Sequence, residues 1–178
     1  TAGIIRCHYG VSSICALALF SLDFFEHAQE LIGIDIEFQQ VGYLVGIGEE
    51  NLVPFRASLA NQRSLGVETE EITPAQAQEL WPTAQVDDYA TFCLEKRGGY
   101  GDGYATVQGL AAYLRTQGVT IRQGAKVAAI ETSEGRADGV KLVDGEVIPA
   151  DVVVVAAGAW SVPLLQPLGI DLPITPQW

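Results

Sequence analysis

Four consecutive valines at residues 152–155 constrain the fold more than any other part of this chain. An unbroken run of β-branched residues is typical of a parallel strand that is buried on both faces of its sheet. The run leads into Ala156, Ala157 and Gly158, and a helix is expected to begin near Ser161. Small residues at the end of a buried strand let a ligand approach the backbone closely. The segment therefore predicts an α/β sheet that binds its ligand at the carboxyl ends of its strands.

Helices are predicted at four places before the valines. They run from Ser12 or Ser13 to about Gly33, over about 50–64, from Pro74 to Pro82, and over about 107–118. The first repeats apolar residues at three- and four-residue steps, with acidic residues on its opposite face, which is the pattern of an amphipathic helix. That apolar stripe consists of Leu17, Phe20, Phe24, Ala28 and Leu31. The third helix opens with a capping box of Thr73 and Gln76.

Short strands are predicted between and after these helices, at residues 38–47, 89–95, 119–123 and 126–131. A hairpin follows, in which Asp144 and Gly145 join residues 139–143 to residues 146–148. An Asp-Gly pair between apolar flanks is a strong hairpin signal. The order of these elements predicts a small β-meander directly before the valine run.

The charge and the rare residue types exclude several functions. Acidic residues outnumber basic ones by 22 to 10, giving a net charge of −12, so neither a nucleic acid nor an anionic membrane is an expected partner. The longest apolar run, residues 152–160, is well short of the about 20 residues that span a membrane. Cys7, Cys15 and Cys93 are too few for a disulfide framework, which favours the cytoplasm. The two histidines show no metal-ligand spacing, so no metal site is expected.

A glycine-rich loop at residues 98–103 is a candidate phosphate site, because it lies between a predicted strand and a predicted helix. It does not match G-x-G-x-x-G, since Tyr104 or Thr106 stands where the last glycine should be. Asp102 also places a negative charge where a phosphate would lie. A tight turn is therefore the favoured interpretation of this loop.

Arg6 is a candidate for binding an anionic substrate. It follows Ile4 and Ile5 in an acidic chain, and a guanidinium group suits bidentate binding of a carboxylate. A structural ion pair with one of the many acidic residues is the alternative, and chemistry alone favours it. The neighbouring Cys7 could be a reactive thiol between Arg6 and His8, although a buried and inert thiol is the favoured interpretation.

Four segments carry a resemblance to a known family: residues 3–10, residues 42–45, Val127, and residues 154–160. Their order and spacing resemble the D-amino-acid-oxidase family of FAD-dependent oxidoreductases, particularly its sarcosine oxidase and dimethylglycine dehydrogenase branch. The resemblance covers essentially the whole chain. Residues 168–174 resemble the family's crossover back toward its substrate domain.

The resemblance implies oxidation of the C–N bond of an amino acid or N-methylated amino acid, with a hydride equivalent passing to FAD. Arg6 would then bind the substrate carboxylate. The implied cofactor-binding residues are Ala2, Gly3, Ile4 and Ile5 along the isoalloxazine ring, Val127 at the adenine through its backbone, Ala156, Ala157 and Gly158 on the adenosine and pyrophosphate side, and Trp160.

The implied fold is α/β, with an FAD-binding-type sheet and β-meander interlocked with an α+β, mixed-sheet substrate-binding subdomain. We expect residues 1–33 to form a flavin-side loop and helix, and residues 34–98 the substrate-binding subdomain. Residues 99–169 would belong to the FAD-binding domain, and residues 170–178 would form the crossover.

The sequence also departs from the family pattern. No opening strand with G-x-G-x-x-G is present, and Gly3 stands where monomeric sarcosine oxidases carry a second arginine. A central fragment of a flavoenzyme, lacking that nucleotide loop and the C-terminal part, is therefore expected. The alternative is a truncated, flavin-free binding or assembly module, in which self-association covers the exposed strand edges.

Overall fold

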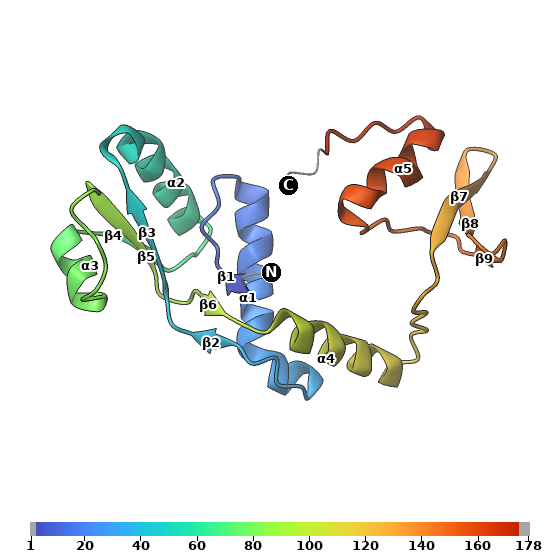
Figure 1. Cartoon of the computed structure of the whole chain (residues 1–178), viewed down its shortest axis with the longest axis horizontal. Helices are drawn as coiled ribbons and strands as arrows, with labels where there is room; N and C mark the ends of the chain where they lie inside the picture. Colours follow the sequence, from blue (N-terminus) through green and yellow to red (C-terminus); the bar gives the residue numbers. More distant parts are fainter. Residues whose placement is uncertain (1–2, 175–178) are drawn as a thin grey trace. The chain divides into compact units, whose positions relative to one another are not determined.

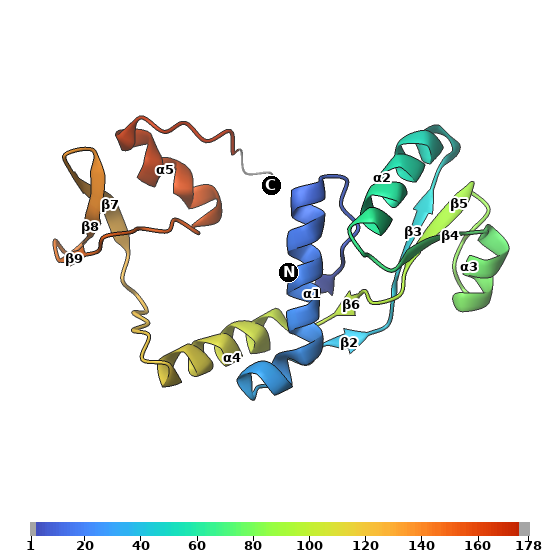
Figure 2. The ribbon, with the colours of Figure 1, turned by 180° about the vertical axis from the view of Figure 1, so that it is seen from behind.

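Residues 3–174 are described by a computed structural model, in which the chain divides after Thr120 into two units (Figures 1 and 2). The first unit contains β1 (Ile4–Ile5), α1 (Ser12–Ile32), β2 (Gln39–Gln40), β3 (Tyr43–Ile47), α2 (Leu52–Ser64), β4 (Thr69–Ile72), α3 (Pro74–Leu80), β5 (Thr91–Glu95), β6 (Gly99–Tyr100) and α4 (Gly103–Thr116). The second contains β7 (Val127–Ser133), β8 (Arg136–Leu142), β9 (Val147–Pro149) and α5 (Ser161–Leu165). The predicted mixture of helices and sheets is confirmed.

The central sheet of the first unit has the strand order β3–β5–β4, with both pairings antiparallel. Side chains alternate between its two faces. Cys93 faces Phe55 and Leu59 of α2, whereas its neighbour Phe92 packs with Ala77 of α3. The two helices therefore cover opposite faces of this sheet, as both ribbon views show (Figures 1 and 2).

A second, smaller sheet places the amino-terminal strand. Strand β6 pairs antiparallel with β1 on one side and with β2 on the other, so that Gly99 lies opposite both Ile5 and Gln40. The predicted strand at residues 38–47 is in fact two strands, because Gly42 adopts a φ of +80° between them. Strands β1 and β6 have two residues each, which is too short for an alternating pattern to be recognised in the sequence.

Local signals mark several elements correctly. The capping box is confirmed, because Gln76 N donates to Thr73 Oγ1 at 3.2 Å and Thr73 N donates to Gln76 Oε1 at 2.8 Å. Helix α1 ends at Gly33, which has a φ of +71°. The hairpin of β8 and β9 around Asp144 and Gly145 is also confirmed, and β7 extends it into the three-stranded meander.

The apolar stripe of α1 is largely exposed, contrary to what an amphipathic helix implies. Leu17, Phe20 and Leu31 are 65%, 73% and 58% exposed, and only Ala28 of the stripe is buried. The helix instead packs through Cys15 and Leu22, which join a core cluster with Cys7 and Val67. The helix carries apolar residues on two faces, and tertiary contacts decide which face packs.

The valine run forms no strand in the part of the chain that the structure describes. Residues 152–155 are irregular, and Val152 and Val154 are 76% and 85% exposed. The prediction of a buried parallel strand is therefore wrong for this segment, as is the strand predicted at residues 119–123. A strand exists only where a neighbouring strand supplies hydrogen bonds, and every strand pairing among residues 3–174 is antiparallel and lies elsewhere.

Within residues 3–174, no helix has the length and apolar character that crossing a membrane requires.

Candidate functional site

A cavity of about 550 Å³ lies beside β1 in the first unit. Such a volume is within the range of small-molecule sites. Its wall consists of Gly3, Ile4, Ile5, Arg6, Tyr9, Phe25, Gly101, Gly103, Thr106 and Val107. Four of the predicted site residues, Gly3 through Arg6, are therefore brought together at one cavity. Its lining is mainly apolar, and Arg6 is the one charged side chain among these lining residues.

The backbone at Gly3 explains how the cavity wall is built. Gly3 has a φ of +63°, and its carbonyl oxygen accepts a hydrogen bond of 2.9 Å from Gly101 N. A Cβ at residue 3 would lie 2.3 Å from the carbonyl oxygen of Gly101. Only glycine fits this position, so residue 3 has a structural role in the cavity wall.

Arg6 is half-buried and holds its guanidinium group between two aromatic rings. Its guanidinium carbon lies 5.0 Å from the centre of the Tyr9 ring and 5.2 Å from that of Tyr43, distances typical of cation–π contacts. Its Nη1 donates to the carbonyl oxygen of His8 at 3.0 Å. Among residues 3–174, no carboxylate lies within 4 Å of this guanidinium, so the predicted ion-pair alternative is not found there.

The two tyrosines beside Arg6 were not singled out from the sequence. Tyr9 follows Arg6 by three residues, whereas Tyr43 lies on β3. Nothing in the spacing of Arg6 and Tyr43 indicates their contact, because it depends on how β3 packs against the amino-terminal segment. A tyrosine in the strand segment that carries the resemblance is the only signal that could have pointed to it.

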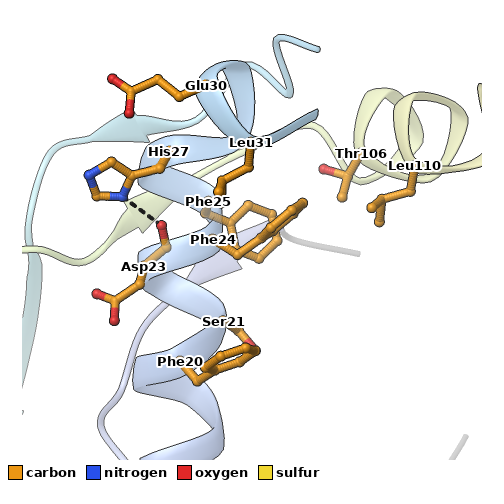
Figure 3. Close-up of a pocket in the computed structure, with 10 residues that line it drawn as sticks. All are labelled: Phe20, Ser21, Asp23, Phe24, Phe25, His27, Glu30, Leu31, Thr106 and Leu110. Carbon is orange, nitrogen blue, oxygen red and sulfur yellow. Dashed lines mark hydrogen bonds between the residues drawn. The ribbon is translucent and has the colours of Figure 1, made fainter. Parts of the chain in front are cut away.

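A second cavity, of about 540 Å³, lies between α1 and α4 (Figure 3). Phe24, Phe25 and Leu31 lie on the side of α1 toward α4, while the polar side chains of Asp23, His27 and Glu30 lie on another side of the helix (Figure 3). Thr106 and Leu110 approach from α4. Phe25 and Thr106 line both this cavity and the one beside β1, so the two are neighbours.

The glycine-rich segment at residues 98–103 is not the tight turn that the sequence favoured, because Gly99 and Tyr100 form strand β6 and Asp102 caps the start of α4. The Asp102 carboxylate accepts hydrogen bonds from the backbone N–H groups of Tyr104 at 2.7 Å and Ala105 at 2.9 Å. These are the free donors at the helix start that a phosphate would need. The loop therefore satisfies its own helix terminus with a side-chain anion.

We expect Asp102→Ala to lower the free energy of unfolding by about 1 kcal/mol, because two N–H groups at the start of α4 lose their acceptor. Asp102→Asn keeps an acceptor oxygen at the same place and is the matched control, with an expected change below about 0.5 kcal/mol. Urea denaturation measures both. Equal stability of the two variants would show that the cap contributes nothing.

Cys7, Cys15 and Cys93 are free thiols, and all three are buried. Burial, together with the nearby Glu95 carboxylate, raises the pKa of Cys7 to about 12. Burial also raises the pKa values of Cys15 and Cys93. The buried position of Cys7 agrees with its favoured interpretation, and because a raised pKa leaves less thiolate at a given pH, we expect all three thiols to be unreactive.

A thiol reagent such as iodoacetamide is accordingly expected to leave all three cysteines unmodified in the native protein at pH 8, because all three are buried and a thiol with the pKa of Cys7 is ionised only to roughly one part in ten thousand. In urea all three should react within minutes. Mass spectrometry counts the modified thiols. Rapid modification of Cys7 in the folded protein would contradict this assignment.

The remaining predicted cofactor residues belong to the second unit, except Ala2, which lies outside the described residues. Val127 begins β7 and pairs with Leu142. Gly158 has a φ of +54° and open space around its Cβ position, and Trp160 is 74% exposed. Ala156 and Ala157 precede them in an irregular segment. These residues stay predictions, and the cavity beside β1 is built by the first unit alone.

The sequence pattern described as FAD dependent oxidoreductase (DAO) matches residues 1–177. The chain belongs to the DAO family. A match over almost every residue includes both the β1 cavity and the meander of the second unit. The relationship therefore does not depend on one short motif.

Individual DAO relatives agree with this assignment. The chain is 29% identical over 177 residues to 4-methylaminobutanoate oxidase (formaldehyde-forming) of Paenarthrobacter nicotinovorans, covering 97% of this chain and 21% of that protein. It is 42% identical over 66 residues to glycine oxidase of Pseudomonas putida, covering 37% of this chain and 18% of that protein. The matched segments thus span about a fifth of the length of these two relatives.

Solved structures show the same fold. L-proline dehydrogenase from P. horikoshii superposes with a TM-score of 0.83 at 23% identity, covering 96% of this chain and 45% of that chain. Glycine oxidase from Geobacillus kaustophilus gives a TM-score of 0.76 at 22% identity, covering 97% of this chain and 48% of that chain. The antiparallel sheets and helices described above are therefore a fold of DAO proteins.

FAD is the cofactor of the DAO family, and the lining of the β1 cavity fits its ring system. The flavin ring is flat, with an apolar benzenoid end and a polar pyrimidine end. Ile4, Ile5 and Val107 offer an apolar wall, while Gly3 and Gly101 bring the backbone close to the cavity without side chains. The residues that line the cavity therefore suit the ring end of FAD. Arg6 supplies a positive charge for a small anion beside that ring.

Proposed function

We propose that this chain contributes to the active site of an FAD-dependent enzyme that oxidises the C–N bond of an amino acid or an N-methylated amino acid. Membership of the DAO family supports the cofactor and the reaction class. Relatives named for methylaminobutanoate, glycine and D-amino acids support the substrate class. Each of these compounds carries an amine and a carboxylate, so the site needs a cation beside a redox-active ring.

The half-buried guanidinium of Arg6 is the observation that carries this proposal. Removing a positive charge from water is costly unless an anion compensates it. Arg6 lines the cavity, and among the described residues it has aromatic neighbours and a carbonyl oxygen but no carboxylate within 4 Å. A substrate carboxylate in the cavity supplies the missing anion through a bidentate pair.

The residues of this chain orient the substrate in the proposed reaction. Arg6 binds the carboxylate, and the rings of Tyr9 and Tyr43 fix the plane of its guanidinium group. Ile5, Phe25 and Val107 give the cavity an apolar lining. FAD, when bound, supplies the acceptor for the hydride equivalent that leaves the carbon next to the amine. The resulting imine is then hydrolysed by water.

The rest of the proposed assignment follows the family resemblance. Ala2, Gly3, Ile4 and Ile5 lie along the flavin ring. Val127, Ala156, Ala157, Gly158 and Trp160 serve the adenosine and pyrophosphate side. Residues 1–33 and 99–169 belong to flavin binding, residues 34–98 to substrate binding, and residues 170–178 to the crossover. The three free, buried thiols favour a reducing compartment such as the cytoplasm.

Anaerobic reduction of the flavin tests the proposed function. The full-length protein, purified with FAD, is expected to be yellow and to lose its visible absorbance when sarcosine or another N-methylated amino acid is added. Dimethylamine, which is sarcosine without its carboxylate, is the matched control and should reduce the flavin far more slowly. A protein that stays colourless with excess FAD would contradict the proposal and favour the flavin-free binding module instead.

A further inference from the structure

A buried carboxylate lies directly behind the segment that carries Arg6. Glu95 is the last residue of β5 and is only 1% exposed. Its Oε1 accepts a hydrogen bond of 2.7 Å from the backbone N–H of Cys7, the residue after Arg6. Its Oε2 has no hydrogen-bond partner among the described residues. A carboxylate in such a place is costly, because burial removes its hydration.

Glu95 is also tied to the second residue that holds Arg6 in place. In the antiparallel pairing of β3 and β5, Glu95 lies directly opposite Tyr43, whose ring contacts the Arg6 guanidinium. Glu95 therefore contacts two neighbours of Arg6. It accepts a hydrogen bond from the backbone of Cys7, and it lies opposite Tyr43 on the paired strand. Of these two, only Tyr43 contacts the guanidinium group itself.

Two thiol contacts also hold this segment, and both are uncharged. Cys15 Sγ donates to the carbonyl oxygen of Cys7 at 3.4 Å, and Cys93 Sγ lies 3.6 Å from His8 Nδ1. Hydrogen bonds to a charged acceptor are about twice as strong as neutral ones. The Glu95 carboxylate is therefore a stronger restraint on the backbone next to Arg6 than either thiol contact.

We propose that Glu95 is a positioning residue, which holds the backbone at Cys7 so that the Arg6 guanidinium stays in the cavity beside β1, ready for a substrate carboxylate. This inference rests on the proposed function, because it assumes that Arg6 binds that carboxylate. Glu95 itself touches neither substrate nor cofactor. Its effect is on how well the cavity recognises an anion.

The test compares an anionic ligand with an uncharged one of the same shape. Binding of propionate and of propionamide to the full-length, FAD-loaded protein is measured by isothermal titration calorimetry at pH 8. We expect Glu95→Gln to weaken propionate binding about ten-fold, which corresponds to one weakened charged hydrogen bond. Propionamide binding should not change. Glu70→Gln, which removes an exposed partner of Lys96 on the neighbouring strand, is the control and should bind both ligands as the wild type does.

Arg6→Gln separates failure of this inference from failure of the proposed function. If Arg6→Gln loses propionate binding and Glu95→Gln does not, the positioning role is overturned while the function of Arg6 stands. If Arg6→Gln binds propionate normally, both are overturned. Equal weakening of propionate and propionamide by Glu95→Gln would show a general disruption, and would also reject the positioning role.

Glu95→Asp covers the case in which Glu95→Gln does not bind FAD. The shorter carboxylate stays charged but retracts by one methylene from the N–H of Cys7, so propionate should still bind several-fold more weakly than to the wild type. Wild-type affinity in an FAD-loaded Glu95→Asp protein contradicts the inference. If neither variant folds, Glu95 is needed for folding, and the positioning role is rejected.

Discussion

Arg6→Gln is expected to raise the KM for an N-methylated amino acid about 100-fold, with kcat changing only a few-fold. The loss of a bidentate, charge-assisted pair corresponds to about 3 kcal/mol. The carboxylate is held equally in the ground state and the transition state, so its loss appears in KM. Arg6→Lys keeps the charge without the planar fork and should have an intermediate effect, about ten-fold.

The matched control for this prediction is Arg56→Gln. Arg56 is an exposed arginine on α2 whose guanidinium pairs with Glu71 at 2.8 Å. Removing it alters the net charge by the same amount as Arg6→Gln, but at a distance from the cavity lining. Steady-state kinetics with sarcosine should therefore separate the two variants. An unchanged KM in Arg6→Gln would remove the carboxylate-binding role.

Gly99→Ala is the second substitution with a large expected effect, and it acts on stability. Gly99 lies in β6 between β1 and β2, where an added Cβ would be 2.1 Å from the carbonyl oxygen of Gln39. The backbone of Gln39 cannot move away from this Cβ without breaking the hydrogen bonds between β2 and β6. We expect the free energy of unfolding to fall by about 3 kcal/mol, the upper range for overpacking.

Gly10→Ala is the control for the glycine substitution. A Cβ at Gly10 would meet nothing closer than Ser58 Oγ at 4.0 Å, and its φ is not in the left-handed region. Urea denaturation followed by tryptophan fluorescence should show Gly10→Ala within about 0.5 kcal/mol of the wild type. If Gly99→Ala proved as stable as Gly10→Ala, the close approach of β6 to β2 would be refuted.

Local chemistry made the helices and the meander predictable. The capping box at Thr73, the left-handed glycine at Gly33 and the Asp144–Gly145 turn act over a few residues, so the sequence pattern determines them. Asp102, whose negative charge made a phosphate site unfavourable, likewise accepts its hydrogen bonds from the first turn of the helix that it caps. These elements need no knowledge of distant partners.

Features that depend on distant partners could not be predicted in the same way. The valine run has the composition of a central strand, yet strand formation requires neighbouring strands. Helix α1 has two apolar faces, and packing against Val67 selects the one with Cys15 and Leu22. Likewise, composition does not reveal that Glu95 reaches the backbone of Cys7, 88 residues earlier in the chain.

The candidate site was predicted in part, and for a physical reason. Gly3, Ile4, Ile5 and Arg6 are consecutive, so a single segment brings them to one cavity. The residues that orient Arg6 come from other elements, namely Tyr43 on β3 and Glu95 on β5. A sequence motif can therefore identify the binding group, whereas its orientation depends on the sheet behind it.

A crystal structure of the full-length, FAD-loaded protein with a bound carboxylate ligand would show directly whether Arg6 binds the substrate carboxylate. We expect the ligand carboxylate to accept two hydrogen bonds of about 2.8 Å from the Arg6 guanidinium, with the flavin ring against Ile4 and Ile5. A ligand carboxylate bound away from Arg6, with the guanidinium still beside Tyr9 and Tyr43 and no anion next to it, would overturn the carboxylate-binding role of Arg6.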